Sequence, residues 1–224
     1  MNILCKESLI YQVVYVDKKL ILLGYSGHAY VAADIALLMG YQMGGYLDQQ
    51  ESLNNPFQIQ YLGSEKNIDL SKFSKDHVFF PAVGDNQIRQ KLFQVMELNV
   101  CLQTKLIHPK AVVSAMACVA DSTLVAASAV INPLAVIGRG CIINTGAVIE
   151  HECQIEDFVH IAPGAVLAGH VSVGHGTFVG AGALVKQGIK IGRNVVVGAG
   201  AVVLADIPDA ETWVGMPASF VKKN

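Results

Sequence analysis

The second half of the chain repeats an aliphatic side chain every six residues. From Ile107 to Val203, each such position holds Ile, Val or Leu without exception. The seventeen positions are Ile107, Val113, Val119, Val125, Ile131, Ile137, Ile143, Ile149, Ile155, Ile161, Leu167, Val173, Val179, Val185, Ile191, Val197 and Val203. Aliphatic residues make up roughly a third of a chain as apolar as this one, so chance would not hold the phase over the whole series. The period predicts a parallel β-helix, a solenoid built from hexapeptide turns.

A column of small side chains runs in phase with the aliphatic one. Two residues before each aliphatic, from Val113 onward, the side chain is usually small and is never charged. Large and small inward positions together would fill a narrow prism without strain. Turn-forming residues such as Asn132, Gly138 and Gly192 often follow the aliphatic. No hexad is interrupted, so we expect a regular solenoid that ends where Pro208 breaks the period.

Bulk properties exclude several classes of function. The net charge is −2 with histidine neutral, which argues against nucleic acid or an anionic membrane as a partner bound through overall charge. The chain is 52% hydrophobic, yet no apolar run approaches the roughly 18 residues of a membrane span. We interpret the start, Met1–Tyr15, as neither signal peptide nor anchor, because it carries Lys6 and Glu7 and lacks a long apolar core.

The cysteines favour a reducing compartment, and we expect a cytoplasmic protein. They are Cys5, Cys101, Cys118, Cys141 and Cys153. Their number is odd, they are scattered, and none forms a CxxC pair of the kind that binds metal. Cys153 follows a histidine-containing turn and suggests a thiol nucleophile. It occupies the small inward phase of the repeat, however, so we expect it to be buried and inert.

The sequence divides into an α/β domain over residues 1–104 and a β-helix with a C-terminal tail over residues 105–224. Strands are expected at Lys19–Gly24, Tyr41–Leu47, Gln58–Leu62 and His77–Val83, and helices at Val31–Met39 and Ile88–Leu98. Asp85 or Asn86 is the expected cap of the second helix. Strands that alternate with helices favour a small Rossmann-like parallel sheet. Residues 1–16 are assigned no element, although an extra strand or hairpin would fit there.

Three short motifs connect the chain to a known family. They are Gly24-Tyr25-Ser26-Gly27-His28 followed by Val31, Gly84-Asp85-Asn86 followed by Arg89, and Glu150-His151-Glu152-Cys153. Together with the hexads they resemble the left-handed β-helix acetyltransferases of nucleotide-linked amino sugars, which are grouped with the sialic-acid O-acetyltransferases. The resemblance implies three hexads per coil, a homotrimer, and acetyl-CoA bound as cosubstrate between neighbouring β-helices. It also implies an N-terminal domain that binds the nucleotide sugar, and no metal.

The predicted chemistry centres on His151. It follows Ile149 by two places, so it belongs to a turn between prism faces and should project outward. Histidine is the usual base near neutral pH, and the resemblance gives the role of general base to His151 and a supporting role to Glu152. With three hexads per coil, residue i lies beneath residue i+18. This places His151 beneath Gly169, our candidate oxyanion donor, and Glu152 beneath His170.

The resemblance also assigns binding residues. For acetyl-CoA these are His160 near the acetyl group and Gly169, which matches a family glycine amide that faces the acetyl carbonyl. We further expect backbone around Gly180, Ala181, Gly198 and Ala199 to line the pantetheine, because small residues suit a narrow cleft, and Lys222 with Lys223 to meet the phosphates. For the nucleotide sugar, Ser26, Gly27 and His28 are assigned to the diphosphate. Asp48 is a candidate for the base or ribose, and Asn86 and Arg89 are further candidates. As an alternative, Arg89 is an exposed helix residue.

We therefore predict transfer of acetyl to the amine of a nucleotide-linked amino-deoxy sugar, for a bacterial surface glycan such as lipopolysaccharide. O-acetylation of a sialic-acid-like sugar is the alternative within the enzyme class, and a non-catalytic trimeric scaffold is the alternative outside it. A zinc-dependent carbonic anhydrase is a further rival, because His170 and His175 resemble its downstream ligand pair. The positions near its third ligand hold Leu134 and Arg139, and catalytic zinc needs three protein ligands.

Overall fold

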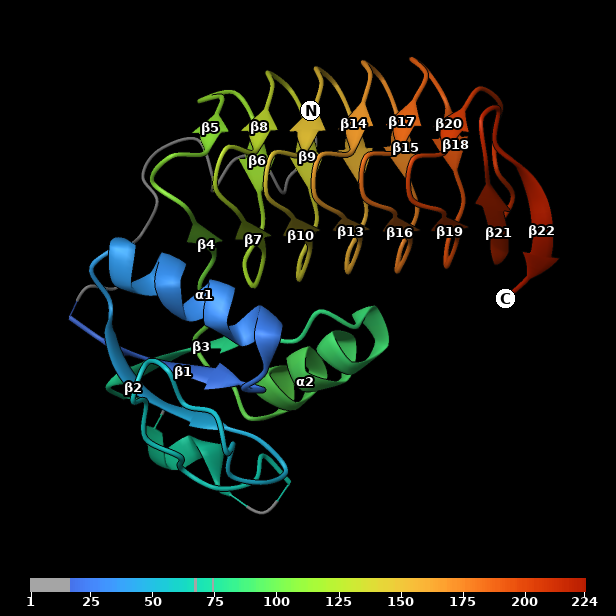
Figure 1. Cartoon of the computed structure of the whole chain (residues 1–224). Coiled ribbons are helices and arrows are strands. Elements are labelled where there is room, and N and C mark those ends of the chain that lie inside the picture. The colour runs from blue at the N-terminus through green and yellow to red at the C-terminus, as the bar shows by residue number, and fades with distance from the viewer. Residues whose placement is uncertain (1–16, 67, 74) are drawn as a thin grey trace. The chain divides into compact units, whose positions relative to one another are not determined.

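A computed structural model of the chain describes residues 17–66, 68–73 and 75–224. The expectations for residues 1–16 lie outside the described residues. Clustering of contacts divides the described chain into two compact units, one ending at Pro109 and one spanning Lys110–Asn224. None of the helices in the described part is long and apolar enough to cross a membrane. Figure 1 shows the elements of both units.

The N-terminal unit is a small α/β domain with a parallel sheet, as the alternating pattern predicted. Its described strands are β1 (Lys19–Leu23), β2 (Gln42–Leu47) and β3 (His77–Pro81), in the order β2-β1-β3. The central strand β1 is buried from Leu20 to Leu23. Its helices are α1 (Gly27–Leu38) and α2 (Asn86–Leu98), with a short 3₁₀ helix, η2, at Leu70–Phe73. The α1 helix contacts β1 and β2, and the α2 helix contacts β3.

Two expectations about local structure need correction. The strand expected at Gln58–Leu62 is wrong, because only Tyr61 forms an isolated parallel bridge, to Tyr46 of β2. Gln58 has a φ of 52°, which interrupts extended backbone at the start of that segment. Helix α1 begins at Gly27 and not at Val31, so the last two residues of the Gly24–His28 motif are the first two of the helix. Helix α2 is capped as expected, since the Asp85 carboxylate accepts the N–H of Ile88 at 2.9 Å.

The second half of the chain is a three-sided solenoid with one short strand for each hexad, and its first strand, β4, precedes the unit boundary at Pro109. Its first face contains β4 (Leu106–Ile107), β7 (Leu124–Val125), β10 (Ile142–Ile143), β13 (His160–Ile161), β16 (Phe178–Val179) and β19 (Val196–Val197). The second contains β5 (Val112–Val113), β8 (Val130–Ile131), β11 (Val148–Ile149), β14 (Val166–Leu167), β17 (Leu184–Val185) and β20 (Val202–Val203). The third contains β6 (Cys118–Val119), β9 (Val136–Ile137), β12 (Gln154–Ile155), β15 (Ser172–Val173) and β18 (Lys190–Ile191). We call these face 1, face 2 and face 3, and we name each edge by the faces it joins.

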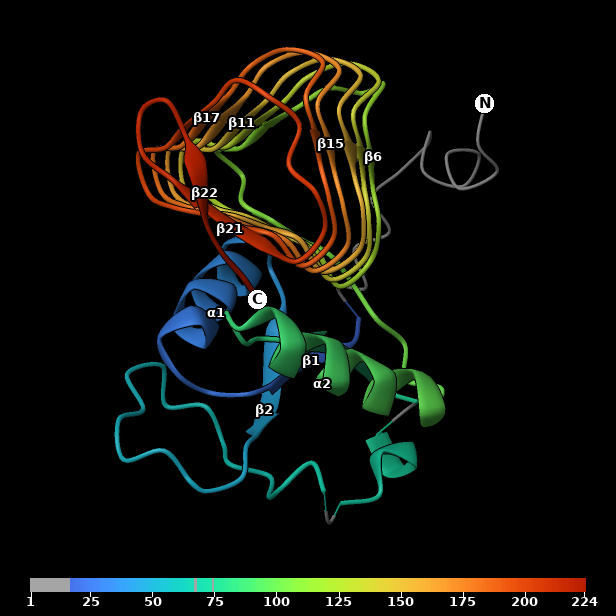
Figure 2. The same cartoon turned by 90° about the vertical axis from the view of Figure 1, so that its right-hand side faces the viewer.

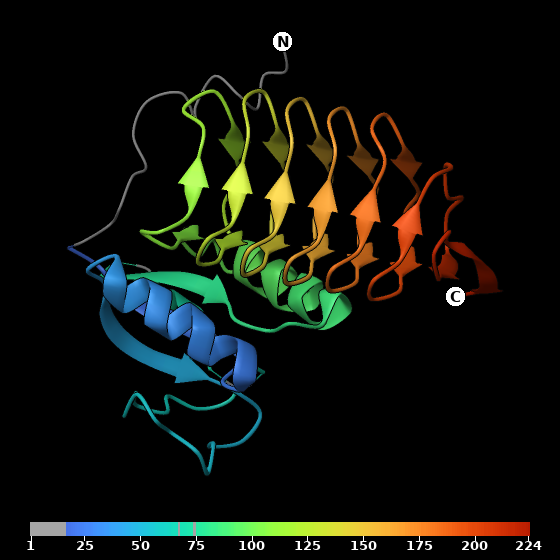
Figure 3. The ribbon, with the colours of Figure 1, turned by 45° about the horizontal axis from the view of Figure 1, so that its top comes forward.

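Strands on one face pair in parallel at a spacing of 18 residues. Ile149 is paired with Leu167, and Ile155 with Val173. This register confirms three hexads per coil, the arrangement of a left-handed hexapeptide β-helix. Figure 2 looks along the solenoid and shows its triangular section, and Figure 3 shows the strands of each face in rows.

The hexad aliphatics form the core of the prism. All of them are buried except Ile107 and Val113, which belong to the first coil. Burying one such side chain contributes roughly 1.5–3 kcal/mol. The corners recur with the same period, since every sixth residue from Ser122 to Gly200 has a positive φ. Glycine occupies half of these corner positions in the described chain and suits them best, because it has no Cβ to oppose a left-handed backbone.

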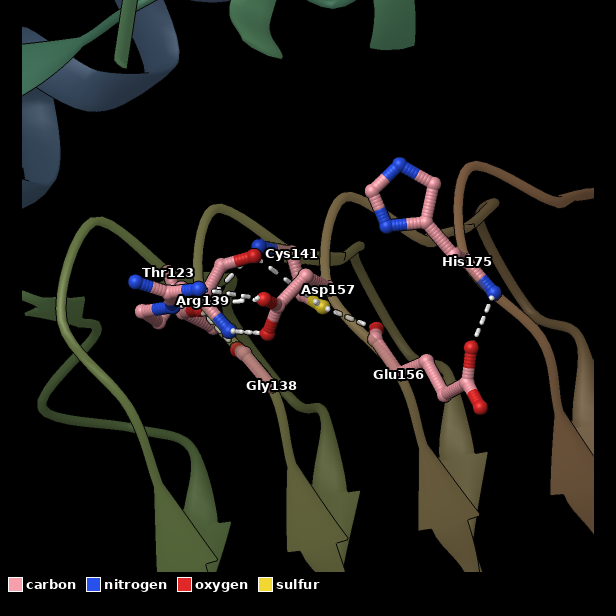
Figure 4. A network of polar contacts seen from close by, with 7 residues as sticks. All are labelled: Thr123, Gly138, Arg139, Cys141, Glu156, Asp157 and His175. Carbon is pink, nitrogen blue, oxygen red and sulfur yellow. Dashed lines mark hydrogen bonds and ion pairs between the residues drawn. The ribbon is translucent and has the colours of Figure 1, made fainter. Parts of the chain in front are cut away.

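Edge 3–1 is held by polar side chains that connect successive coils (Figure 4). The Asp157 carboxylate accepts the backbone N–H of Arg139 at 2.7 Å and pairs with its guanidinium at 2.9 Å. One coil further on, the Glu156 carboxylate accepts the N–H of His175 at 2.9 Å. Inside the prism, the Thr123 hydroxyl donates to Gly138 O and accepts the N–H of Cys141. Thr177 makes the same two contacts, to Gly192 O and the N–H of Val195.

The tail covers the last coil on every face. On face 1, β21 (Glu211–Val214) pairs in parallel with β19, and β22 (Ser219–Lys223) pairs antiparallel with β21. On face 3, Ile207 bridges Ile191. On face 2, the N–H of Val202 donates to Gly215 O, and Val202 O accepts the N–H of Ala218. The end of the solenoid is therefore closed by its own chain.

Candidate active site

His151 occupies a corner of the solenoid on edge 2–3. The strand β11 ends at Ile149, whose side chain points into the core, and the chain turns through Glu150 and His151 to a left-handed Glu152 with φ 61°. The side chains of His151 and Glu152 are 49% and 40% exposed. Because inward positions are fixed by the hexad, the corner residues must project away from the core. The outward orientation of His151 is thus a direct result of its place in the repeat.

Glu152 lies between two imidazoles. His151 donates from Nδ1 to Glu152 Oε2 at 3.0 Å, and His170 Nε2 lies 2.8 Å from the same oxygen, within ion-pair distance. A carboxylate can only accept, so the contact assigns the Nδ1 proton to neutral His151. The Nε2 atom of His151 is then the one with a free lone pair. The contact between Glu152 and His170 on adjacent coils agrees with the 18-residue register.

Gly169 lies directly above the His151 ring. A Cβ atom placed on Gly169 would be 2.5 Å from Cε1 and 2.6 Å from Nε2 of His151. Any side chain at this position would therefore displace the imidazole from beneath it. Within the described residues, the Gly169 N–H donates no hydrogen bond to the protein. The base atom and an available backbone donor thus lie next to each other, although their catalytic roles stay a prediction.

His160 lies on face 1, outside the His151 cluster. It belongs to β13, its Nε2 is 3.2 Å from Asn144 Nδ2, and its ring meets that of Phe178 edge-on with centroids 5.0 Å apart. Sequence reasoning did not single out Asn144 or Phe178. The register could have found Phe178, because it follows His160 by 18 residues. No spacing rule points to Asn144, whose side chain reaches across from a corner.

The other predicted acetyl-CoA residues lie on a different edge from His151. Gly180-Ala181 and Gly198-Ala199 form corners on edge 1–2, and Lys222 lies on the exposed strand β22. One chain therefore does not bring these residues together with His151. Gly180 also has a structural reason to be glycine, since a Cβ there would be 2.5 Å from Ala199 N.

In the N-terminal unit, the Gly24–His28 motif forms the turn from β1 into α1. Ser26 is the N-cap residue of α1 and its side chain makes no capping bond. A Cβ on Gly27, the first residue of α1, would meet nothing within 4 Å, so there is open space beside this residue. Asp48 accepts the N–H of Tyr25 at 2.8 Å and that of Gln49. In the structure Asp48 therefore supports the turn, and its predicted contact with a nucleotide is untested.

Arg89 is fully buried, so the alternative of an exposed helix residue is wrong. Its guanidinium donates to Val83 O at 3.1 Å, to Gly84 O at 2.9 Å and to Asn86 Oδ1 at 2.7 Å. It thus fixes the loop between β3 and α2 from inside. A buried guanidinium that holds three acceptors is suited to shaping this loop, because its planar fork has fixed donor directions.

Comparison with known proteins agrees with both units. A family model described as the PglD N-terminal domain matches residues 19–96. The bacterial transferase hexapeptide model matches residues 134–169, and a model described as the hexapeptide repeat of succinyl-transferase matches residues 170–205. The acetyltransferase domain of PglB from Neisseria gonorrhoeae, in complex with acetyl-CoA, is 33% identical with a TM-score of 0.86, and the match covers 92% of this chain and 100% of that one. PerB from Caulobacter crescentus, in complex with CoA and GDP-perosamine, is 33% identical with a TM-score of 0.86, covering 91% of this chain and 97% of that one.

The chain belongs to the nucleotide-amino-sugar N-acetyltransferases. Like other members of this family it is a hexapeptide acetyltransferase that uses acetyl-CoA as cosubstrate. The resemblance deduced from the three motifs is therefore confirmed.

The sequence suggested two other chemistries, a thiol nucleophile at Cys153 and a zinc site at His170 and His175. The Cys153 thiol is buried and lies 3.3 Å from Ala168 O, and burial raises its pKa above the ordinary value, which disfavours a thiolate nucleophile. His170 and His175, the suggested zinc pair, lie on different edges of the prism. His151, Glu152 and His170 do place three potential metal-ligand atoms within 4.8 Å of one another. In that set His151 is hydrogen-bonded to Glu152, and His170 lies within ion-pair distance of the same carboxylate.

Proposed function

We propose that this chain transfers acetyl from acetyl-CoA to the amine of a nucleotide-linked amino-deoxy sugar, with His151 as general base. The observation that carries the proposal is the His151–Glu152 pair beneath Gly169 on a hexapeptide solenoid. The likeness to PerB with GDP-perosamine and to PglB with acetyl-CoA supports this substrate class.

The geometry supports direct transfer without an acetyl-enzyme. The amine nitrogen attacks the thioester carbonyl carbon, a C–N bond forms, and the C–S bond to coenzyme A breaks. His151 Nε2 takes the proton that the nitrogen loses and returns it to the departing thiolate. Base catalysis of this kind contributes roughly 10²–10⁴-fold. Glu152 holds the opposite nitrogen of the ring, which fixes the tautomer and stabilises the imidazolium, as carboxylates do in other histidine sites.

Gly169 serves as the oxyanion donor in this scheme. The carbonyl oxygen gains negative charge as the amine adds, and a backbone N–H aimed at it stabilises the transition state more than the ground state. The Gly169 N–H meets two requirements of that role, because it adjoins the His151 ring and has no acceptor among the described residues. We assign no metal ion to the mechanism.

The active enzyme is a homotrimer in this proposal, because face 2 carries an unbroken apolar column. The outward residues of its strands are Val112, Val130, Val148, Val166, Leu184 and Val202. Edge 2–3 with His151 and edge 1–2 with the predicted coenzyme residues flank this face. Packing of face 2 against a neighbouring copy would bring edge 2–3 of one chain toward edge 1–2 of another. Leu184→Glu should then weaken assembly, which light scattering would measure.

The N-terminal unit is proposed to bind the nucleotide sugar over residues 1–104. The open space beside Gly27, the first residue of α1, suits a diphosphate, because helix N-termini offer free backbone N–H groups to anions. Arg89 supports the neighbouring loop from inside. The product belongs to bacterial surface-glycan synthesis, and we place the enzyme in the cytoplasm, where acetyl-CoA is supplied.

A panel of nucleotide-linked amino sugars tests the proposal. Each is incubated with acetyl-CoA and the enzyme, and released thiol is followed together with the mass of the sugar. We expect at least one amino sugar to gain a single acetyl group on nitrogen. Acetylation of hydroxyl-only acceptors with no reaction at any amine would overturn the assignment, and acetyl bound covalently to the protein would overturn direct transfer.

A further inference from the structure

The contact between Glu152 and His170 has no part in the mechanism above, yet its geometry is specific. His170 Nε2 and His151 Nδ1 both reach Glu152 Oε2, at 2.8 and 3.0 Å. The two imidazoles are nearly perpendicular, with centroids 5.6 Å apart. The carboxylate is therefore held from two sides, by one histidine of its own coil and one of the next coil.

The backbone under this contact is unfavourable for both residues. Glu152 and His170 occupy the same corner on successive coils, with φ of 61° and 59°. Half of the described corners use glycine there, including Gly188 on the following coil. A side chain other than glycine, asparagine or aspartate in this region has a measurable energetic cost, and such positions gather at functional sites. Glu152 and His170 therefore occupy two stacked corners at which glycine would adopt the backbone conformation at lower cost.

We propose that His170 is a positioning residue that holds the Glu152 carboxylate against His151. The inference rests on the proposed role of His151 as base. Without this second contact, the Glu152 side chain, 40% exposed, could rotate into solvent and leave the imidazole of His151 without support. His170 itself does not reach the reacting atoms through this contact, because its Nε2 is occupied by Glu152. Its effect is transmitted through the carboxylate and concerns the orientation of the base.

Two substitutions of His170 separate this role from a structural one. Glutamine places its amide nitrogen near the position of a histidine Nε2 and can donate to Glu152. Asparagine is shorter and cannot, but it tolerates a left-handed backbone better than glutamine does. A positioning role predicts that His170→Gln keeps activity and His170→Asn loses it. A purely structural role of this corner predicts the reverse order.

With both substrates saturating, we expect His170→Asn to lower kcat by about 10-fold, the size of effect that the loss of one polar contact to a charged group can have. KM for acetyl-CoA and for the sugar should each change by less than about 2-fold. The loss of a direct binding contact would change KM by more than this. His170→Gln should recover kcat to within about 3-fold of the wild type. This remaining reduction is smaller than the effect of losing one hydrogen bond. In a Glu152→Asn background, His170→Asn should have almost no further effect, because the carboxylate it holds is gone.

The controls separate other causes. All assays contain a chelator, so a metal ion bound by the three side chains cannot produce the effect. His175→Ala removes a histidine from a different edge and should leave kcat unchanged. Imidazole ¹⁵N spectra of the wild type should show the proton on Nδ1 of His151 and on Nε2 of His170. Opposite tautomers would overturn the proposal without reference to turnover.

The outcomes distinguish this inference from the proposed function. If the wild type acetylates no amino sugar, the function fails before any variant is compared. If the wild type is active and His170→Asn equals it, or if His170→Asn and His170→Gln fall equally, the positioning role is wrong while the function stands. The same holds if His170→Asn reduces kcat as strongly in the Glu152→Asn background as it does alone.

Discussion

The two units of this acetyltransferase fix their functional residues in different ways. In the solenoid, a repeated register places each residue relative to those 18 positions away, so Glu152 and His170 meet because of their spacing. In the α/β unit, each important contact occurs once. Arg89 is fixed by acceptors at Val83, Gly84 and Asn86, none of which follows from a period. In a repeat, the relative positions of residues can therefore be predicted from their spacing in the sequence. In a fold without repeats, they depend on individual contacts that the spacing does not predict.

The largest expected effect tests the solenoid site directly. His151→Asn should lower kcat by about 10²–10⁴-fold, because the proposed general base is lost. The half-exposed corner makes no core contacts that the change would remove, so the thermal midpoint should change little. Thiol release at saturating substrates measures the rate, and calorimetry provides the control. Turnover equal to the wild type would remove His151 from the mechanism.

A pair of glycine substitutions comes next and separates chemistry from packing. Gly169→Ala would place a methyl 2.5 Å from His151 Cε1 and so displace the base, which should lower kcat by about 10²-fold with a modest loss of stability. Gly174→Ala would instead place its methyl 2.6 Å from the backbone carbon of Gly192. That contact cannot relax by a side-chain rotation, so this variant should chiefly lose thermal stability. Equal losses of kcat and stability in both variants would contradict the distinction.

The third change tests the unique contacts of the α/β unit. Arg89→Met leaves the acceptors of the β3–α2 loop without their donor and should reduce that unit's stability by about 3 kcal/mol. The only tryptophan in the sequence, Trp213, lies on β21 and reports on the solenoid, while the described helices, α1 and α2, belong to the α/β unit. Urea unfolding should therefore shift the helical circular dichroism and leave the tryptophan transition in place. A joint shift would show that the units unfold together.

A fourth pair of changes tests whether the same hydrogen-bonding arrangement contributes equally to stability in two different coils. Thr123→Val and Thr177→Val each remove a hydroxyl that serves one carbonyl and one N–H inside the prism. Each should cost about 1–3 kcal/mol, since two buried groups lose their partner. The exposed corner substitution Thr145→Val is the matched control and should cost less than about 0.5 kcal/mol. A large difference between the two buried sites would show that coils are not equivalent.

The smallest effect is expected at Cys153. Burial raises its thiol pKa, so the group stays protonated at pH 7–8 and should react slowly with iodoacetamide. Burial also raises the pKa of Cys101 to about 11, with the same consequence. Cys153→Ala should keep kcat within about 2-fold, because an inert core thiol has no part in base catalysis. Rapid alkylation of Cys153 with loss of activity would restore the thiol as a candidate nucleophile.

The contrast between the units also explains what the sequence could predict. The hexads predicted the core and the corners, because every inward position follows from one phase. The stacking of His151 under Gly169 needed in addition the three hexads per coil that the family resemblance implied. The segment at Gln58–Leu62 looked like a strand by composition, but its first residue, Gln58, is left-handed and only Tyr61 forms a bridge to β2. The sequence predicted that Arg89 lies on a helix, but it could not predict whether its side chain is buried. That burial depends on three acceptors, at Val83, Gly84 and Asn86. The sequence did not predict that His151 and Gly180 lie on different edges of the prism. This followed only from the assignment of strands to faces in the structure.

The closed end of the solenoid has a consequence for colloidal behaviour. Open parallel strands at the end of such a prism would be a template on which further copies could add and grow into filaments. Here the outermost strand runs in the opposite direction and carries Lys222 and Lys223, which oppose end-to-end growth. The number of coils is thus capped from within, and a chain cut before Glu211 is expected to polymerise along its axis.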